Sequence, residues 1–282
     1  MSADVRPAST VVLLRQGGGG PEVFLVRRHQ AIAFMGGAHV FPGGRVEDAD
    51  RDSAWHDAVD GLAGALARMP AEAPAVALGF YVAAAREMFE EAGVLLARGS
   101  GGAIVSFAAD DAAGITEQRQ AVNRGTLPLI ELLMARRWRL ALDALVYFAH
   151  WVTPPIETRR FDTRFFLAAA PALQAPAHDA GETTDGVWLR PADAIARCLD
   201  GAIALPPPTW TTLRWLEPFR QVEAALAAAG QKRVPRIEPG FIKDGETRIV
   251  TLPGDRTMPR VDGFDAKETR FLLAGGRWTP VS

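Results

Sequence analysis

Short apolar runs and glycine breaks alternate near the start of the chain. Residues 10–14 and 23–26 are apolar runs, and the glycines at 17–20 lie between them. This pattern is typical of two strands joined by a turn. A longer stretch, about 75–92, has helical spacing, and Gly93 follows it as the residue that commonly ends a helix. We therefore predict a strand pair followed by a long helix.

The rest of the chain predicts further helices, then strands, then a β-rich tail. A segment of mixed character at 100–143 is expected to contain a helix over about 127–142. Beyond residue 234 the tail is predicted to be β structure with turns at glycines. The other predicted strands cover 144–152, 161–167 and 186–189, and the other predicted helices cover 191–199 and, after a proline linker at 206–208, residues 209–229.

The composition is that of an ordinary globular protein. The 282 residues include 31 Lys and Arg, 33 Asp and Glu, and 48% hydrophobic residues, which excludes disordered, collagen-like and coiled-coil chains. Only 3 of the basic residues are lysines, so 31 − 3 = 28 are arginines. Arginine is well suited to phosphate, but a net charge of −2 argues against a nucleic-acid-binding surface.

The sequence also limits the compartment and the partners. The first ten residues contain no apolar segment, and no run of 18 apolar residues follows, so we expect neither a secretory signal nor a membrane helix. The single cysteine, Cys198, excludes an internal disulfide and a cysteine-rich zinc site. We expect a cytoplasmic protein without a membrane partner, and the sequence leaves open whether it forms a homodimer.

Three acids form the most informative cluster of the chain. Glu87, Glu90 and Glu91 have spacings of i, i+3 and i+4, so they project from one face of the predicted helix. Carboxylates this close repel one another unless a cation compensates. Arg86 lies at i, i+4 to Glu90, and an oxygen-rich cluster suits Mg²⁺ or Mn²⁺. The alternative is a solvated acidic helix face that holds no metal.

Two segments together resemble the Nudix box, the motif of the Nudix hydrolase family. Residues 86–93 read Arg-Glu-x-x-Glu-Glu-x-Gly, and residues 41–44 read Phe-Pro-Gly-Gly. The family pattern is G-x5-E-x7-R-E-U-x-E-E-x-G-U, in which U is aliphatic. The arginine of the pattern follows the glycine by 14 positions, whereas Arg86 follows Gly44 by 42, so 28 residues are inserted here.

The inserted residues displace the first acid of the motif. Counted back from Arg86, the pattern's first glutamate falls on Leu78, so this acid is missing, and Glu47 near the opening glycines is a candidate for part of its role. A long insertion at this point is similar to the peroxisomal-type coenzyme A diphosphatases and their bacterial relatives. Further segments that resemble this branch are residues 152–154, 160–166 and 205–210.

The resemblance implies an architecture and a domain organisation. Nudix domains are α/β/α sandwiches, in which a mixed sheet lies between helices. We expect such a domain over residues 8–230, with insertions at about 47–77 and 100–143. A C-terminal β-rich extension over residues 231–282 is expected to follow it.

The resemblance also implies a reaction and a set of acids. Nudix enzymes hydrolyse a nucleoside diphosphate linked to another group, and divalent ions neutralise the diphosphate and lower the pKa of bound water. Glu87, Glu90 and Glu91 match the family's metal-binding acids. Arg86 matches the arginine that orients them by ion pairing.

A later acid often completes such a site. Glu182 is the candidate, because it precedes Trp188 by six residues, the offset that one branch of the family uses for its late metal ligand. Asp185 is the rival, and an ordinary loop acid is the alternative. The general base is either Glu91 or Glu182.

Glycines and arginines are the candidates for substrate contacts. The two glycines of the Phe-Pro-Gly-Gly segment allow the backbone to pass close to the helix and the metal. Two arginines end the second predicted strand near this loop, and two more flank the start of a later strand. The alternative for the later pair is surface ion pairing. These candidates are Gly43, Gly44, Arg27, Arg28, Arg160 and Arg164.

Three functions are compatible with these residues. The first is a Mg²⁺- or Mn²⁺-dependent diphosphatase that acts on coenzyme A or acyl-coenzyme A. The second is hydrolysis of ADP-ribose, dinucleotides or nucleotide sugars. The third is a ligand-binding regulator without turnover, but regulators commonly lose acids of the motif, and this chain keeps three acids and the arginine.

Overall fold

The computed structural model describes residues 4–30, 36–107, 111–174, 176, 183–245 and 247–281. The α-helices are α1 (Leu62–Ala67), α2 (Pro74–Ala92), α3 (Ala112–Asn123), α4 (Leu129–Arg136), α5 (Pro191–Leu199), α6 (Pro207–Leu216) and α7 (Val222–Gln231). Short 3-10 helices are η1 (Asp48–Arg51), η2 (Ser53–Asp57) and η3 (Leu142–Ala144). The strands are β1 (Val5–Gly17), β2 (Gly20–Arg28), β3 (His39–Val40), β4 (Gly43–Arg45), β5 (Val59–Asp60), β6 (Ala97–Arg98), β7 (Arg139–Ala141), β8 (Val146–Val152), β9 (Arg160–Ala169), β10 (Thr183–Leu189), β11 (Arg236–Ile237), β12 (Gly240–Asp244), β13 (Thr247–Thr251), β14 (Arg270–Ala274) and β15 (Arg277–Pro280).

A mixed eight-stranded sheet forms the centre of the molecule. Its order is β10-β2-β1-β9-β8-β11, with β3 paired to β2 and β4 paired to β1. β1 is antiparallel to β2 and parallel to β9. The predicted strand pair at the start of the chain is confirmed, and it closes with Gly17 opposite Gly20.

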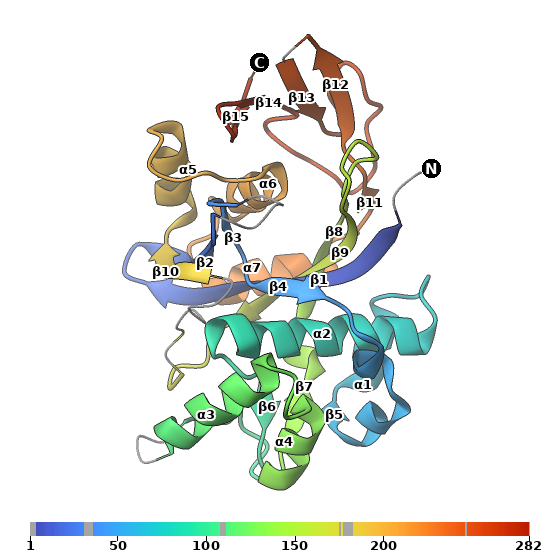
Figure 1. The fold of residues 1–282 in the computed structure, drawn as a ribbon, viewed down its shortest axis with the longest axis vertical. Coiled ribbons are helices and arrows are strands. Elements are labelled where there is room, and N and C mark those ends of the chain that lie inside the picture. The colour runs from blue at the N-terminus through green and yellow to red at the C-terminus, as the bar shows by residue number, and fades with distance from the viewer. Residues whose placement is uncertain are drawn as a thin grey trace.

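Helices cover both faces of this sheet, with α2 on one side and α5, α6 and α7 on the other (Figure 1). Side chains alternate between the faces of a strand. Val11 and Leu13 of β1 therefore join the core that contains α2, whereas Val12 and Leu14 join the core that contains α5 to α7. The predicted α/β/α sandwich is confirmed.

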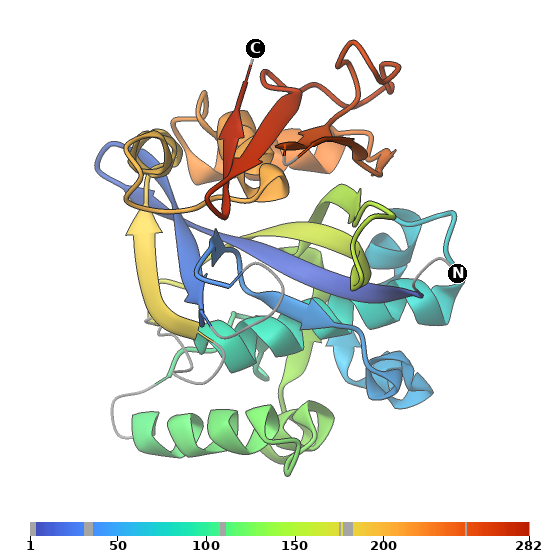
Figure 2. The same ribbon diagram turned by 45° about the horizontal axis from the view of Figure 1, so that its top comes forward.

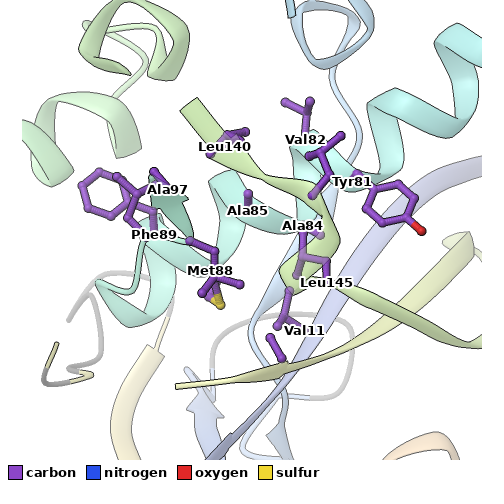
Figure 3. Packing of buried hydrophobic residues seen from close by; sticks show 14 of the residues in the cluster. Val11, Tyr81, Val82, Ala84, Ala85, Met88, Phe89, Ala97, Leu140 and Leu145 are labelled. Carbon is purple, nitrogen blue, oxygen red and sulfur yellow. The ribbon is translucent and has the colours of Figure 1, made fainter. Parts of the chain in front are cut away.

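The helix α2 carries the acid cluster and is packed from two sides. Pro74 is its first residue, where the missing N–H has no cost, and Gly93 ends it in the left-handed conformation at φ 69°. The end at Gly93 is the one that the sequence predicts. Val11 of the main sheet and Leu140 of β7 belong to the same apolar core around this helix (Figure 3). Burial from two sides fixes the position of the acids near the end of α2.

The predicted insertions pack against each other on the far side of α2. The segment 47–77 contains η1, η2, β5, α1 and the start of α2, and the segment 100–143 contains α3, α4 and β7. β5 and β6 flank β7 in a three-stranded sheet below α2 in Figure 1. The insertions therefore form one layer that supports the acid-bearing helix.

The C-terminal residues form a sheet of their own at the opposite end of the molecule (Figure 2). Its order is β12-β13-β14-β15, with antiparallel neighbours throughout. The predicted β structure of the tail is thus confirmed. The boundary at residue 231 stays a prediction. β11 lies beyond this boundary in the sequence, yet it pairs with β8 of the main sheet.

One predicted helix ends earlier than expected. The segment 127–142 was expected to be helical throughout, but it forms only α4. Arg137 ends this helix in the left-handed conformation, at φ 55°. Residues 139–141 then extend as β7, where pairing with β5 and β6 replaces helical hydrogen bonds.

A second predicted helix is divided in two. The segment 209–229 forms parts of α6 and α7, with a break around Pro218, whose ring nitrogen has no hydrogen to donate to a continuous helix. The prolines at 206–208 are not a linker, since Pro207 opens α6, where the missing donor has no cost. None of the described helices combines the length and the hydropathy needed to cross a bilayer.

Candidate active site

A cavity of about 370 Å³ lies beside the acid-bearing end of α2. Glu87, Glu90 and Glu91 line it from the helix, and Gly43 and Gly44 line it from β4. We name this cavity the acid cleft. The fold thus brings together the two segments that resemble the halves of the Nudix box, although 28 extra residues separate them.

Arg86 is the centre of the ion pairs in the acid cleft. Its Nη1 donates to Glu87 Oε1 at 2.9 Å and to Glu90 Oε2 at 3.2 Å, and its Nη2 donates to the backbone oxygen of Arg45 at 2.8 Å. Burial opposes the charge of Arg86, but the hydrogen bond to Asp50 and the charges of the surrounding acids raise its pKa. The guanidinium therefore stays charged and holds two carboxylates in place.

Asp50 supplies the acid that sequence reasoning placed at Leu78. The Nε and Nη2 of Arg86 donate to Asp50 Oδ1 and Oδ2, each at 3.0 Å, and the Asp50 side chain is only 3% exposed. Leu78 instead lies in the apolar core around α2. Counted forward from Gly44, the family spacing reaches Asp50, so the inserted residues follow this acid. Glu47 donates its backbone N–H to Asp50 Oδ2 at 2.8 Å and so supports the same carboxylate.

The two glycines allow the backbone to approach the acids closely. The N–H of Gly43 donates to Glu91 Oε2 at 2.9 Å. A Cβ on Gly43 would lie 2.3 Å from the backbone oxygen of Ser9, and a Cβ on Gly44 would lie 2.5 Å from the carboxylate of Glu87. Position 43 therefore requires glycine, whereas a side chain at position 44 would push the Glu87 carboxylate away, in agreement with the close approach that the sequence predicts.

Burial changes the acid–base behaviour of the cleft acids. It raises the pKa of Glu87 to about 7, since it disfavours the carboxylate more than the neighbouring Arg86 favours it, and the charge of Glu90 raises the pKa further. Burial also raises the pKa of Glu90. A cation bound among these groups would offset both the burial and the repulsion.

The donor set of the acid cleft suits a hard divalent ion, because it consists of carboxylate oxygens. Within the described parts of the chain, no three such groups converge on one ion-binding point. Glu87 and Glu90 turn to Arg86, and Glu91 accepts from Gly43. The chemistry fits Mg²⁺ or Mn²⁺, and the side chains must rotate to share one ion.

Positive charge and an amide complete the lining of the acid cleft. Arg28 lines it, and the buried Nε of Arg28 has no hydrogen-bond partner among the described residues. Arg159 and Asn123 also line it, and neither was predicted. Arg159 directly precedes β9, and of the two neighbouring arginines it is Arg159 rather than Arg160 that lines the cleft. Asn123 ends α3 of the second insertion and carries no signal in the sequence.

Three of the predicted substrate-binding arginines are absent from the described lining of the acid cleft. Arg160 donates from Nη2 to Glu238 at 2.6 Å. Arg164 is 3% exposed and pairs with Glu72. Arg27 is exposed on β2. Arg160 and Arg164 thus form ion pairs, which was the alternative to phosphate binding. Both arginines are buried, so these are not the surface ion pairs that the sequence led us to expect.

The predicted late metal ligand is not settled by the structure. Glu182 lies outside the described residues. Its rival Asp185 lies on β10 opposite Arg27, is exposed, and is not among the described residues that line the acid cleft. A fourth acid at this site therefore stays a prediction.

A second cavity of about 180 Å³ adjoins the acid cleft. Both cavities are lined by Thr10, Arg28, Gly43, Phe161 and Thr163, so they lie directly beside each other. The second cavity extends from this shared border to the start of α6 and to the C-terminal sheet, and its lining is mainly aromatic, aliphatic and proline side chains. We name it the apolar chamber.

Comparison with known proteins identifies relatives of this chain. The family model of the NUDT19 Nudix domain matches residues 67–216. The acyl-coenzyme A diphosphatase NUDT19 of Xenopus laevis is 27% identical over 272 residues, which cover 84% of this chain and 71% of the relative. The human protein of the same name is 28% identical and covers 84% and 72%, respectively.

A solved structure resembles the whole architecture. The crystal structure of a Nudix hydrolase from Alicyclobacillus acidocaldarius superposes with a TM-score of 0.65 at 28% identity. The match covers 80% of this chain and 96% of the other. The likeness therefore extends well beyond the motif of α2.

Proposed function

Because this chain belongs to the NUDT19 Nudix domain family of Nudix hydrolases, we propose that it hydrolyses the diphosphate linkage of coenzyme A or an acyl-coenzyme A with the aid of a divalent metal ion. The relatives from Xenopus laevis and human carry the name acyl-coenzyme A diphosphatase. The observation that supports the proposal most is the buried cluster of Arg86 with Asp50, Glu87 and Glu90 beside the two glycines.

Glu87, Glu90 and Glu91 are the proposed ligands of Mg²⁺ or Mn²⁺, with Glu182 as a further candidate. When bound, such an ion neutralises the diphosphate and lowers the pKa of water. Arg86 holds Glu87 and Glu90 ready at the rim of the cavity. Burial raises the pKa of Glu87 to about 7, and a bound cation would lower it again by favouring the carboxylate.

The other residues of the acid cleft orient the substrate. Arg28 and Arg159 place positive charge on the lining, where a diphosphate oxygen can accept from their guanidinium groups. The N–H of Gly43 fixes Glu91 at 2.9 Å and keeps its carboxylate oriented. Water attack on phosphorus needs a proton acceptor, for which Glu91 and Glu182 are the candidates.

A substrate panel tests the proposal. Coenzyme A, an acyl-coenzyme A, ADP-ribose, a dinucleotide and a nucleotide sugar are each incubated with Mg²⁺, Mn²⁺ or EDTA, and products are identified by mass spectrometry. We expect cleavage of coenzyme A between its phosphates with either ion and none with EDTA. Hydrolysis of ADP-ribose or a nucleotide sugar alone would assign a different substrate class, and tight binding without any cleavage would indicate a regulator.

A further inference from the structure

The apolar chamber has a lining that selects what can enter it. Five of its described lining residues are prolines, namely Pro154, Pro206, Pro207, Pro208 and Pro239. Proline has no backbone N–H to donate. The proline part of the wall is therefore unable to donate to a hydrogen-bond acceptor, and polar atoms buried against it would lose their bonds to water without replacement. The side-chain donors of the lining include Thr10, Arg28, Thr153, Thr163 and Thr209.

The C-terminal extension closes one side of this chamber. Trp278 of β15 and Val250 of β13 line it, together with Trp151 of β8. The extension is anchored nearby, since Trp210 of α6 donates from Nε1 to Glu268 at 3.1 Å. The four-stranded sheet lies beside α6 and near the ends of β8 and β9 (Figures 1 and 2). A complete chamber therefore requires residues beyond 231.

The position of the chamber limits which part of a substrate reaches it. Its border with the acid cleft is formed by Thr10, Arg28, Gly43, Phe161 and Thr163. The group that enters must be attached directly to the diphosphate held in the cleft. In coenzyme A, the pantetheine arm begins with a methylene group followed by a gem-dimethyl carbon, whereas the nucleoside side continues into a ribose with hydroxyls and ends in a base that needs hydrogen bonds.

We infer that the apolar chamber binds the pantetheine arm of the substrate, with its gem-dimethyl carbon between Phe161 and the proline wall, and that Trp278 makes the C-terminal extension a specificity element. This inference rests on the proposed function, because it assumes a coenzyme A-type substrate. The volume of about 180 Å³ is sufficient for the gem-dimethyl end of the arm, since an apolar cavity of about 150 Å³ accepts a benzene molecule. The polar parts of the arm continue toward the mouth, where Thr153 and Glu157 lie.

Two substrates that share adenosine diphosphate, but differ in the group on the other side of the diphosphate, test which group enters the chamber. Dephospho-coenzyme A carries the pantetheine arm and ADP-ribose carries a second ribose, so only the first has a group for the chamber. We expect Trp278→Ala to lower kcat/KM for dephospho-coenzyme A about tenfold, as loss of apolar contact in a pocket does, and to change the value for ADP-ribose by less than about twofold. Trp278→Phe should restore most of the loss.

A matched variant controls for damage to the C-terminal sheet. Phe241 of β12 is partly buried in the same sheet but is absent from the described lining of the chamber. Phe241→Ala should therefore leave the ratio of the two kcat/KM values unchanged, and the melting temperature of each variant is measured alongside. If Trp278→Ala does not fold, Trp278→Leu serves, since it keeps an apolar side chain on β15.

The outcomes separate this inference from the proposed function. An equal loss for both substrates in Trp278→Ala, or no loss for either, would overturn the inference while coenzyme A hydrolysis stands. If the wild-type chain hydrolyses neither coenzyme A nor dephospho-coenzyme A, the proposed function fails, and titration calorimetry with 4′-phosphopantetheine and AMP tests the chamber without turnover. Weaker binding of 4′-phosphopantetheine alone in Trp278→Ala would support the chamber, and any other result would contradict it.

Discussion

The acid cleft and the apolar chamber share a border, but they are built in different ways. The reactive groups of the cleft come mainly from one helix and one short strand, with Arg86 tying the acids together. The chamber is assembled from β8, β9, the start of α6 and the C-terminal sheet. The cleft is made of charged groups with fixed partners, whereas the chamber is made of surfaces that offer few partners.

This difference separates chemistry from selectivity. Carboxylates and arginines at fixed spacing bind and orient a diphosphate, and the diphosphate is the group that all substrates of the family have in common. An apolar wall contributes nothing to bond cleavage but discriminates between the groups attached to that diphosphate. Changes in the cleft should therefore affect every substrate alike, and changes in the chamber should affect only some.

The largest effect is expected from Glu91→Gln. The change keeps the size of the side chain and an acceptor for the N–H of Gly43, but it removes the charge of a proposed metal ligand. Turnover should fall by orders of magnitude for every substrate, while the melting temperature stays close to wild type. Glu131→Gln on the exposed face of α4 is the control. Normal turnover in Glu91→Gln would remove Glu91 from the site.

Gly44→Ala should disturb the cleft without unfolding it. The new Cβ would lie 2.5 Å from the Glu87 carboxylate, which has to move away. A displacement of about 1 Å at a catalytic group lowers activity about a hundredfold. Gly18→Ala, which adds a Cβ in open space, is the matched control. Equal activity of the two variants would show that the position of Glu87 is unimportant.

Asp50→Asn tests whether Asp50 fills the place of the missing acid. It weakens the buried pair with Arg86, so activity should fall between about 10- and 100-fold, and unfolding should become easier by about 3 kcal/mol. Steady-state kinetics and denaturant titration measure the two effects. Asp48→Asn, two residues away, is the control, because the Asp48 side chain is fully exposed. Similar behaviour of both variants would refute the role given to Asp50.

The smallest effect is expected from Arg28→Ala. Arg28 lies on the shared border of the two cavities and its buried Nε has no described partner. Loss of a charged hydrogen bond to the diphosphate should raise KM about tenfold with little change in kcat. Arg27→Ala, on the exposed side of the same strand, should leave KM unchanged. A raised KM in Arg27→Ala together with an unchanged KM in Arg28→Ala would place the ligand on the other face of β2.

Much of the fold was predictable because it rests on local periodicity. The strand pair around Gly17, the helix α2 and its end at Gly93 each have a pattern within the segment itself. The helix of residues 209–229 is predicted too long because helical composition continues across Pro218 and only the proline marks the break. The sequence does not mark Arg137 as the end of α4, because the surrounding fold rather than the residue type produces its left-handed conformation.

The site was predictable where its residues are close in sequence. Glu87, Glu90 and Glu91 are predicted from helical spacing. Asp50 pairs with Arg86 across 36 positions, and the family spacing leads to Asp50 only when it is counted forward from Gly44 instead of back from Arg86. The chamber was not predicted as a cavity. Residues 152–154, 160–166 and 205–210, which resemble the coenzyme A diphosphatase branch, supply much of its lining, but Trp278 is distant from them in the chain, and prolines and tryptophans usually have structural roles.

The most direct test of the account is a crossed comparison of Glu91→Gln and Trp278→Ala. The kcat/KM of each variant is measured for dephospho-coenzyme A and for ADP-ribose in the presence of Mg²⁺. We predict that Glu91→Gln abolishes hydrolysis of both substrates, whereas Trp278→Ala lowers only that of dephospho-coenzyme A. A Trp278→Ala variant that loses both activities in parallel, or a Glu91→Gln variant that retains either one, would contradict the separation of the acid cleft from the apolar chamber.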